Sequence, residues 1–323
     1  MGFDCSYHPV DLDFFGERLV PYLLGEASIE PLLKEAVALE KLRFRAKAWA
    51  LATLTKSQEN RKGTKGPGTL DSNLHVWGRP FFIEADDPAE VSGYIDRYLA
   101  ARTPAQIDAI AKEVKHKLLP ALDVEPDMGA GIPAKKALES AVLNNLNVLA
   151  DVVSAYKSGK KTIVLPSGNE DTPEHVLMGS YPTLALTFAS RFRPGWMDRG
   201  MVWPTLLMAN AKLDCRKFFE PPAPLFGTLF EVFPKLRKAK LRRTIEENYM
   251  VGGYVPKDRI AELRAHLTEE SEALLAKPKK EKWEEDAKLS LQKIDEALAD
   301  AELRGLAFVE ATEVYSAPLG MLN

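Results

Sequence analysis

Cysteine and histidine are scarce in this chain. It has two cysteines, Cys5 and Cys215, and five histidines among 323 residues. Two cysteines so far apart provide no disulfide framework, so we expect a reducing, cytoplasmic environment. Cys5 and His8 have the spacing of half a zinc site, but no second half with close spacing follows. The sequence therefore predicts no metal site and no cofactor.

Long apolar runs and a strong net charge are also missing. No run approaches the roughly 18 residues needed to span a bilayer, and the first ten residues lack the pattern of a secretory signal. The net charge is only −3, which gives no global attraction to nucleic acid or to an anionic membrane. Hydrophobic residues make up 46% of the chain and charged residues 28%, which is typical of a soluble globular protein.

Helical periodicity dominates what is present. Apolar residues that recur every three or four positions predict long helices, and Asp-Pro and Thr-Pro pairs mark the starts of two more. The predicted helices cover residues 14–24, 28–56, 87–101, 103–119, 133–157, 204–217, 236–247 and 283–301. Short strands are predicted at 3–8, 74–83, 162–165 and 306–315. We predict an α+β fold, predominantly helical, with a small sheet of short strands in which the first and last strands meet.

The chain is expected to form a single domain over residues 1–323. Residues 58–68 contain four glycines or prolines and four charged residues, which predicts a mobile loop there. Between Asn248 and Asp258, two adjacent glycines predict a tight turn. Pro256 and Asp258 then predict the start of a helix.

No catalytic motif can be assigned from the sequence, because the serine-nucleophile, Walker and dinucleotide-binding patterns are missing. The first candidate site is a segment that interleaves three arginines with two aromatic residues. Its candidate binding residues are Arg191, Arg193, Trp196 and Arg199. Such a segment could stack a base or hold an anion. It could equally cover the core with its aromatic rings and pair its arginines with carboxylates.

The second candidate site is a stretch with six basic residues in nine. They are Lys235, Arg237, Lys238, Lys240, Arg242 and Arg243. This stretch could attract an acidic or phosphate-rich partner, including nucleic acid. The alternative is a solvated helix face that nearby glutamates partly neutralise.

Three segments carry a resemblance to known proteins: the opening MGFD…YH, the turn GGYVPKD before an amphipathic helix, and the ending EATEVYSAPLG. Together they resemble uncharacterised bacterial proteins, some of which are similar to toxin-neutralising immunity proteins. The resemblance covers only the two ends of the chain and brings no catalytic residue with it. It implies a bacterial protein that binds another protein.

We therefore predict a non-catalytic bacterial protein-binding protein, an inhibitor or a toxin-immunity type of partner. The alternative is an enzyme whose arginine cluster holds an anionic or nucleotide-like substrate, with His175 or Glu174 as acid or base. Binding of nucleic acid through residues 235–243 is a third hypothesis and is not favoured.

Overall fold

Four antiparallel strands form the central sheet, in the order β4-β1-β6-β5. The computed structural model describes residues 5–61, 88–118, 120–121, 123–125, 134–165, 168–192, 198–238 and 251–312. The strands are β1 (Cys5–Val10), β4 (Asp198–Gly200), β5 (Val251–Val255) and β6 (Ala307–Thr312). β1 and β6 pair along their whole length, from Cys5 with Thr312 to Val10 with Ala307. The expected pairing of the first and last strands is therefore confirmed.

Helices form most of the rest of the described chain. They are α1 (Leu12–Phe14), α2 (Val20–Leu24), α3 (Glu30–Arg61), α5 (Pro88–Ala100), α6 (Pro104–Leu118), α7 (Lys135–Lys157), α8 (Pro173–Ala189), α9 (Pro204–Asn210), α10 (Leu229–Val232), α11 (Ile260–Glu269), α12 (Ser271–Glu281) and α13 (Glu284–Arg304). A hairpin of β2 (Ile163–Val164) and β3 (Glu170–Asp171) connects α7 to α8. The predominantly helical α+β fold is confirmed.

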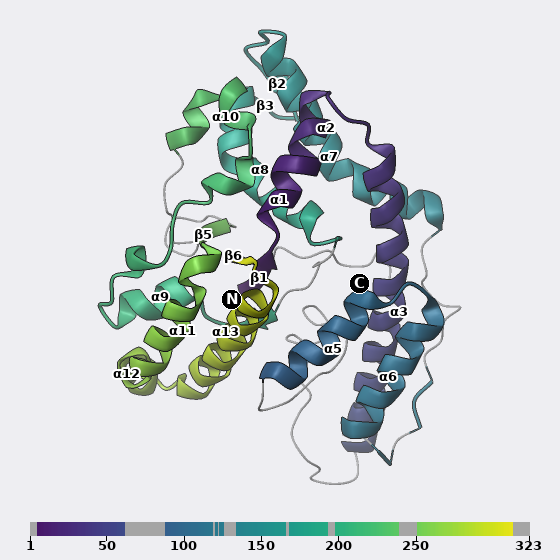
Figure 1. Ribbon diagram of the computed structural model, residues 1–323, viewed down its shortest axis with the longest axis vertical. Helices are drawn as coiled ribbons and strands as arrows, with labels where there is room; N and C mark the ends of the chain where they lie inside the picture. Colours follow the sequence, from purple (N-terminus) through teal and green to yellow (C-terminus); the bar gives the residue numbers. More distant parts are fainter. Residues whose placement is uncertain are drawn as a thin grey trace.

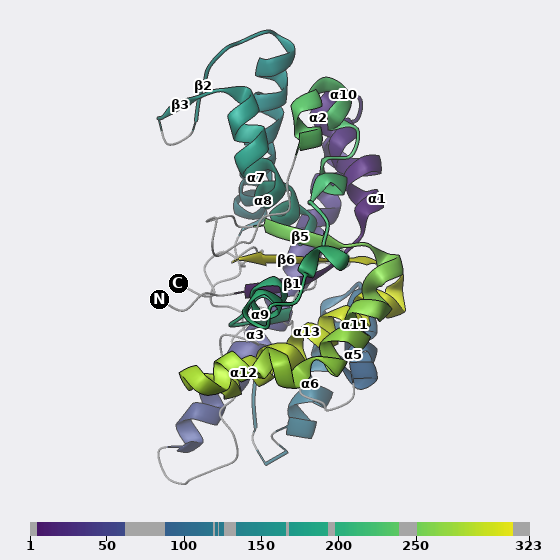
Figure 2. The same cartoon turned by 90° about the vertical axis from the view of Figure 1, so that its left-hand side faces the viewer.

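The sheet separates two layers of helices (Figure 2). Successive side chains of a strand point to opposite faces, so Tyr7 and Phe308 enter a lower core with Ile294 of α13. Val10 and Val309 enter an upper core formed with α1, α2, α7 and α8. A third core joins α3, α5 and α6 at one side of the molecule (Figure 1). Because α3 contributes to both the upper and the third core, it connects these parts of the fold.

Local signals explain several helix boundaries. The Thr172 hydroxyl accepts a hydrogen bond from the backbone N–H of His175, and Pro173 occupies the first turn of α8, which is the usual N-cap arrangement. α13 ends at Gly305, which has a φ of 65°. Glycine adopts this left-handed conformation without steric cost. The start of α8 and the end of α13 are therefore determined by the residues at those positions.

The structure differs from the sequence-based predictions in the region after α8. The two glycines after Val251 lie within strand β5, whose register with β6 is irregular between Val251 and Tyr254. The helix predicted at 204–217 ends at Asn210, and residues 215–217 form a separate 3-10 turn. Of the helix predicted at 236–247, residues up to Lys238 belong to a 3-10 turn and the remainder lies outside the described residues.

The region after α3 also differs. Residues 58–61 of the expected mobile loop are helical, because α3 continues through Arg61. The other residues of that loop and the strand predicted at 74–83 lie outside the described residues. Among the helices that the structure describes, none combines the length and the hydropathy needed to cross a membrane.

Candidate functional site: a buried arginine cluster

Of the arginine–aromatic segment, the structure places the side chains of Arg191 and Phe192. Phe192 is buried in the upper core. Arg191 follows the end of α8 and is 9% exposed. Arg199 belongs to β4, where only the backbone is described, and Arg193 and Trp196 lie outside the described residues. Of the four candidate binding residues in this segment, Arg191 is therefore the one whose side chain the structure describes.

The basic stretch begins on the surface. Lys235 and Arg237 are exposed, and the Lys235 Nζ lies 2.5 Å from a carboxylate oxygen of Glu174. This hydrogen bond raises the pKa of Lys235. Only the backbone of Lys238 is described, and Lys240, Arg242 and Arg243 lie outside the described residues.

The two candidate sites lie near opposite ends of α8. Glu174 is in its first turn and Arg191 lies two residues past its last residue, Ala189, so the two are about 25 Å apart along the helix axis, at 1.5 Å per residue. His175, in the first turn, has its Nδ1 2.7 Å from Asp171 at the surface, and this contact lowers the pKa of Asp171. Neither Glu174 nor His175 shares a site with Arg191.

Arg191 instead meets two charged residues of α3. The Nε of Arg191 lies 3.9 Å from Oε1 of Glu40, and the Nη1 of Arg43 lies 3.8 Å from the same oxygen. All three side chains are at least 90% buried. We call these three residues the arginine cluster.

The end of α8 explains why two arginines converge here. The Arg43 Nη2 donates a hydrogen bond to the carbonyl of Ser190, and the Arg191 Nη1 donates to the carbonyl of Thr187 at 3.0 Å. The carbonyls of a last helical turn lack partners within the helix and carry the negative end of its dipole. The C-terminus of α8 therefore attracts both guanidinium groups.

Burial has an electrostatic cost in this cluster. It lowers the pKa of the Arg191 guanidinium, and the nearby charge of Arg43 adds to this effect while Glu40 opposes it. Lys47, one turn further along α3, is also buried, with 3% of its surface exposed. Charged groups so far from solvent are uncommon unless they are paired or functional.

The spacing of the charged residues in α3 indicates that they are buried, although none of them is among the predicted site residues. Glu40, Arg43 and Lys47 follow one another at intervals of three and four, so they lie on one face of the helix. Ala36 lies on the same face and is fully buried. Three charges that continue an apolar face indicate a polar site within the interior.

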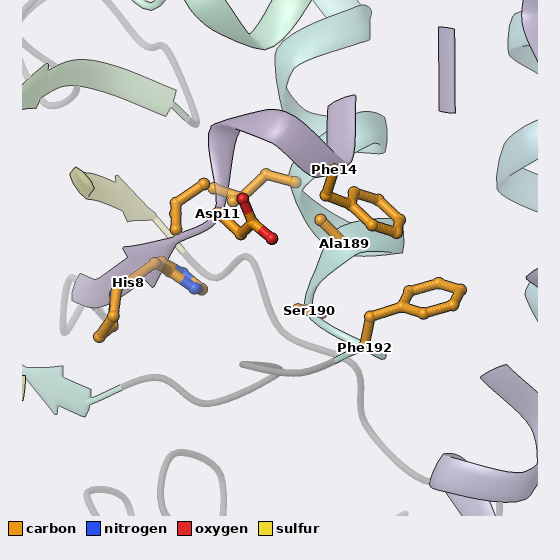
Figure 3. A pocket seen from close by; sticks show the side chains of 9 residues that line it. His8, Asp11, Phe14, Ala189, Ser190 and Phe192 are labelled. Atoms are coloured by element: carbon orange, nitrogen blue, oxygen red, sulfur yellow. The ribbon is translucent and has the colours of Figure 1, made fainter. Parts of the chain in front are cut away.

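A small hollow lies between β1, α1 and the end of α8 (Figure 3). It is lined by His8, Pro9, Val10, Asp11, Phe14, Leu186, Ala189, Ser190 and Phe192 and has a volume of about 20 Å³, which is room for about one water molecule. Its lining includes Ser190, whose carbonyl accepts a hydrogen bond from Arg43. Within β1, His8 Nε2 lies 3.0 Å from the hydroxyl of Ser6. Cys5 enters the lower core, on the opposite face of β1, so Cys5 and His8 do not form a common metal site.

A second buried ionisable group lies in the sheet. Glu310 of β6 is fully buried and accepts hydrogen bonds from the hydroxyl of Thr205 at 2.5 Å and from its backbone N–H at 3.1 Å. Burial raises the pKa of Glu310 to about 7, although the two hydrogen bonds act in the opposite direction. These bonds join β6 to the start of α9, so a structural role accounts for this residue.

Exposed apolar side chains identify a different surface. Among the described residues, four large apolar side chains are markedly exposed: Val164 (68%), Leu303 (66%), Met201 (46%) and Met178 (41%). Val164 is on the β2–β3 hairpin and Met178 is in α8, the helix that follows directly. The hairpin projects from the upper layer (Figure 2).

Comparison of the chain with models of protein families, with curated proteins and with solved structures finds no match.

Proposed function

We propose that this chain binds another protein through the surface formed by the β2–β3 hairpin and the first turns of α8, which we call the hairpin surface. The observation that carries the proposal is the exposure of Val164 on the projecting hairpin and of Met178 on the helix that follows it. An exposed valine on a short strand and an exposed methionine on the adjoining helix are suited to contact with an apolar patch on a partner.

Charged side chains are also exposed on or beside the hairpin and at the start of α8. Lys160, Lys161 and Glu170 are exposed on or beside the hairpin, and the Lys235–Glu174 ion pair lies at the start of α8. A rim of charged groups around a small apolar centre is the usual composition of a non-obligate interface. Lys235 and Arg237 extend this rim, so part of the basic stretch would contribute to the same surface.

The partner class follows from the resemblance of the chain ends to bacterial immunity-type proteins. We propose an inhibitory role in a bacterial cell, in which the hairpin surface covers a functional region of a toxin or enzyme. Such a role needs shape and charge complementarity and no catalytic group in the binding protein.

The test is capture of the partner by tagged variants from a lysate of the source organism. We expect Val164→Asp and Met178→Asp each to weaken binding of the captured partner at least tenfold, about 1.4 kcal/mol, because each places a charge in the apolar centre. Leu303→Asp is the matched control, since Leu303 is as exposed as Val164 but lies on α13. Equal capture by all three variants would exclude the hairpin surface.

The alternative function, an enzyme that acts on an anionic substrate, has one supporting observation. Arg191 and Arg43 converge on Glu40, so two guanidinium groups could hold a substrate anion. The proposed acid or base at His175 or Glu174 is about 25 Å away along α8, and the catalytic part of this hypothesis would need other residues.

A further inference from the structure

We propose that an extended segment of a partner protein, carrying acidic side chains, pairs with the outer edge of β2 and adds a third strand to the β2–β3 hairpin. The inference rests on the proposed function and names the kind of segment that the hairpin surface would bind. It depends on three observations: the register of the hairpin, the open edge of β2 and the charges beside that strand.

The register of the hairpin shows where the backbone groups of Val164 point. Val164 pairs with Glu170, and the backbone N–H of the next residue, Leu165, donates a hydrogen bond to the carbonyl of Asn169 at 2.8 Å. In an antiparallel ladder, pairs that exchange hydrogen bonds alternate with pairs that do not. Because Leu165 bonds toward β3, the N–H and C=O of its neighbour Val164 point away from β3, at the outer edge of β2.

That outer edge is open in the part of the chain that the structure describes. The small sheet there has two strands, β2 and β3, and Val164 forms no hydrogen bond with a described residue outside the hairpin. Ile163 and Leu165 pack against the upper core, whereas the side chain of Val164 is exposed, since successive side chains point to opposite faces. An edge with unpaired backbone groups is a template for another strand, and extended peptides bind to proteins in this way.

Two lysines identify the kind of segment that fits this edge. Lys160 and Lys161 directly precede β2, are exposed, and form no ion pair with any residue that the structure describes. Lysine beside an open edge opposes pairing with a neutral or basic strand, because the added strand leaves the charge unpaired. Acidic side chains on the added strand would supply the missing partners, so charge complementarity selects an acidic segment.

The acidic residues near the hairpin leave this preference in place. Glu174 already forms an ion pair with Lys235. Glu170 and Asp171 are on β3, so β2 lies between them and an added strand, about 10 Å at the usual spacing of strands. A second copy of this chain is a poorer occupant, since it would bring two further lysines to the same small sheet.

Hydrogen exchange of single amides, followed by NMR on the full chain, tests the direction of the Val164 backbone. The probe is a short synthetic peptide with blocked ends that alternates glutamate and valine. In the free chain, the Val164 amide should exchange at least tenfold faster than the Leu165 amide, which is bonded within the hairpin. With the peptide bound, the two amides should exchange at similar rates, because the Val164 N–H then donates to the added strand.

Val164→Pro separates strand addition from a simple apolar contact. Proline keeps an apolar side chain and removes an N–H that the ladder with β3 does not use, which edge strands tolerate. We expect this variant to bind the acidic peptide at least tenfold more weakly. Val164→Thr is the matched control: it keeps the N–H and nearly the same side-chain shape, and its binding should weaken less than threefold.

The charge of the segment is tested with a second peptide, in which lysine replaces each glutamate. The unaltered chain should bind this basic peptide at least tenfold more weakly than the acidic one. The double variant Lys160→Glu, Lys161→Glu should bind the basic peptide more tightly than the acidic one. Because both lysines are exposed, this variant keeps the proposal testable even if Val164→Pro distorts the hairpin.

Four results would overturn the proposal. They are the lack of saturable binding of the acidic peptide, equal affinity for the acidic and basic peptides, an unchanged exchange rate of the Val164 amide at saturation, and unweakened binding to Val164→Pro. A dimer of the unaltered chain that Val164→Pro dissociates would assign the edge to a second copy and would also overturn it.

Failure of this inference can be distinguished from failure of the proposed function. If Val164→Asp weakens binding of the captured partner and Val164→Pro does not, the hairpin surface remains the contact and strand addition is excluded. If Val164→Pro weakens binding of the acidic peptide while Val164→Asp and Met178→Asp leave capture unchanged, strand addition stands and the proposed function fails.

Discussion

Replacement of Gly200 by alanine is expected to lower the free energy of unfolding by about 3 kcal/mol, the upper part of the range for an overpacked core. Gly200 is in β4 and pairs with Cys5 of β1. A Cβ atom at this position would lie 2.9 Å from two ring carbons of Tyr7 and would also collide with its hydroxyl. Tyr7 is fully buried, and its hydroxyl donates a hydrogen bond to the carbonyl of Val202, so the ring cannot move aside without the loss of that bond.

The matched control is Gly93→Ala in α5. No atom lies within 4 Å of a Cβ built at Gly93, and alanine in a helix is more favourable than glycine by about 0.5–1 kcal/mol. Urea denaturation should therefore show opposite changes for the two substitutions. Equal effects of the two variants would contradict the close approach of β4 to Tyr7.

Replacement of Glu310 by glutamine is expected to remove a pH dependence of stability of about 3 kcal/mol. The pKa of this carboxyl is raised from 4.5 to about 7 in the folded chain, and a difference of about 2.5 in pKa corresponds to about 3 kcal/mol. In the unfolded chain the carboxyl loses its proton near pH 4.5, whereas the folded chain retains the proton until about pH 7. The folded state therefore binds more protons between these values, and its stability decreases as the pH rises from 4.5 through 7.

The measurement is the free energy of unfolding from urea titrations between pH 5 and pH 8.5, for the unaltered chain and for Glu310→Gln. An amide stays neutral throughout this range, and its oxygen can still accept a hydrogen bond from Thr205. We expect the variant to be the more stable protein by up to about 3 kcal/mol at pH 8.5 and to lose this advantage near pH 5. Glu285→Gln is the control, because Glu285 is 86% exposed. Parallel curves for Glu310→Gln and the unaltered chain would contradict the raised pKa.

Much of the helical structure was predictable because helix formation follows local rules. The regular spacing of apolar residues located α3, α7 and α13, and a glycine past the last apolar position located the end of α13. The strand signals at the two ends of the chain were also correct, and these strands pair in the sheet. In each case the residues that determine the element lie within it or next to it.

β5 shows where local rules fail. Two adjacent glycines favour a turn on conformational grounds, yet these residues form part of a buried strand. Pairing with β6 and the bridge between Tyr254 and Glu220 provide hydrogen bonds that the local sequence does not reveal. Tertiary contacts therefore outweighed the preference of the two glycines.

The arginine cluster required the tertiary structure for the same reason. Arg43 and Ser190, which share a hydrogen bond, are 147 residues apart in the sequence. A charge on a helix is usually solvated, yet the elements around α3 leave Glu40 and Arg43 buried. Arg191 was identified in the sequence as a binding candidate, but neither its burial nor its two neighbours could be inferred from adjacent residues.

The sequence by itself determined the positions of the main helices, the two terminal strands and the predominantly helical α+β class, because periodicity, caps and glycine stops act over a few residues. The tertiary structure alone decided which charges are buried and which apolar side chains remain exposed on the hairpin surface. It also decided that Gly200 lies against the ring of Tyr7. Those properties depend on contacts between segments far apart in the chain. The exclusion of water and the close packing at these contacts supply the free energy of folding.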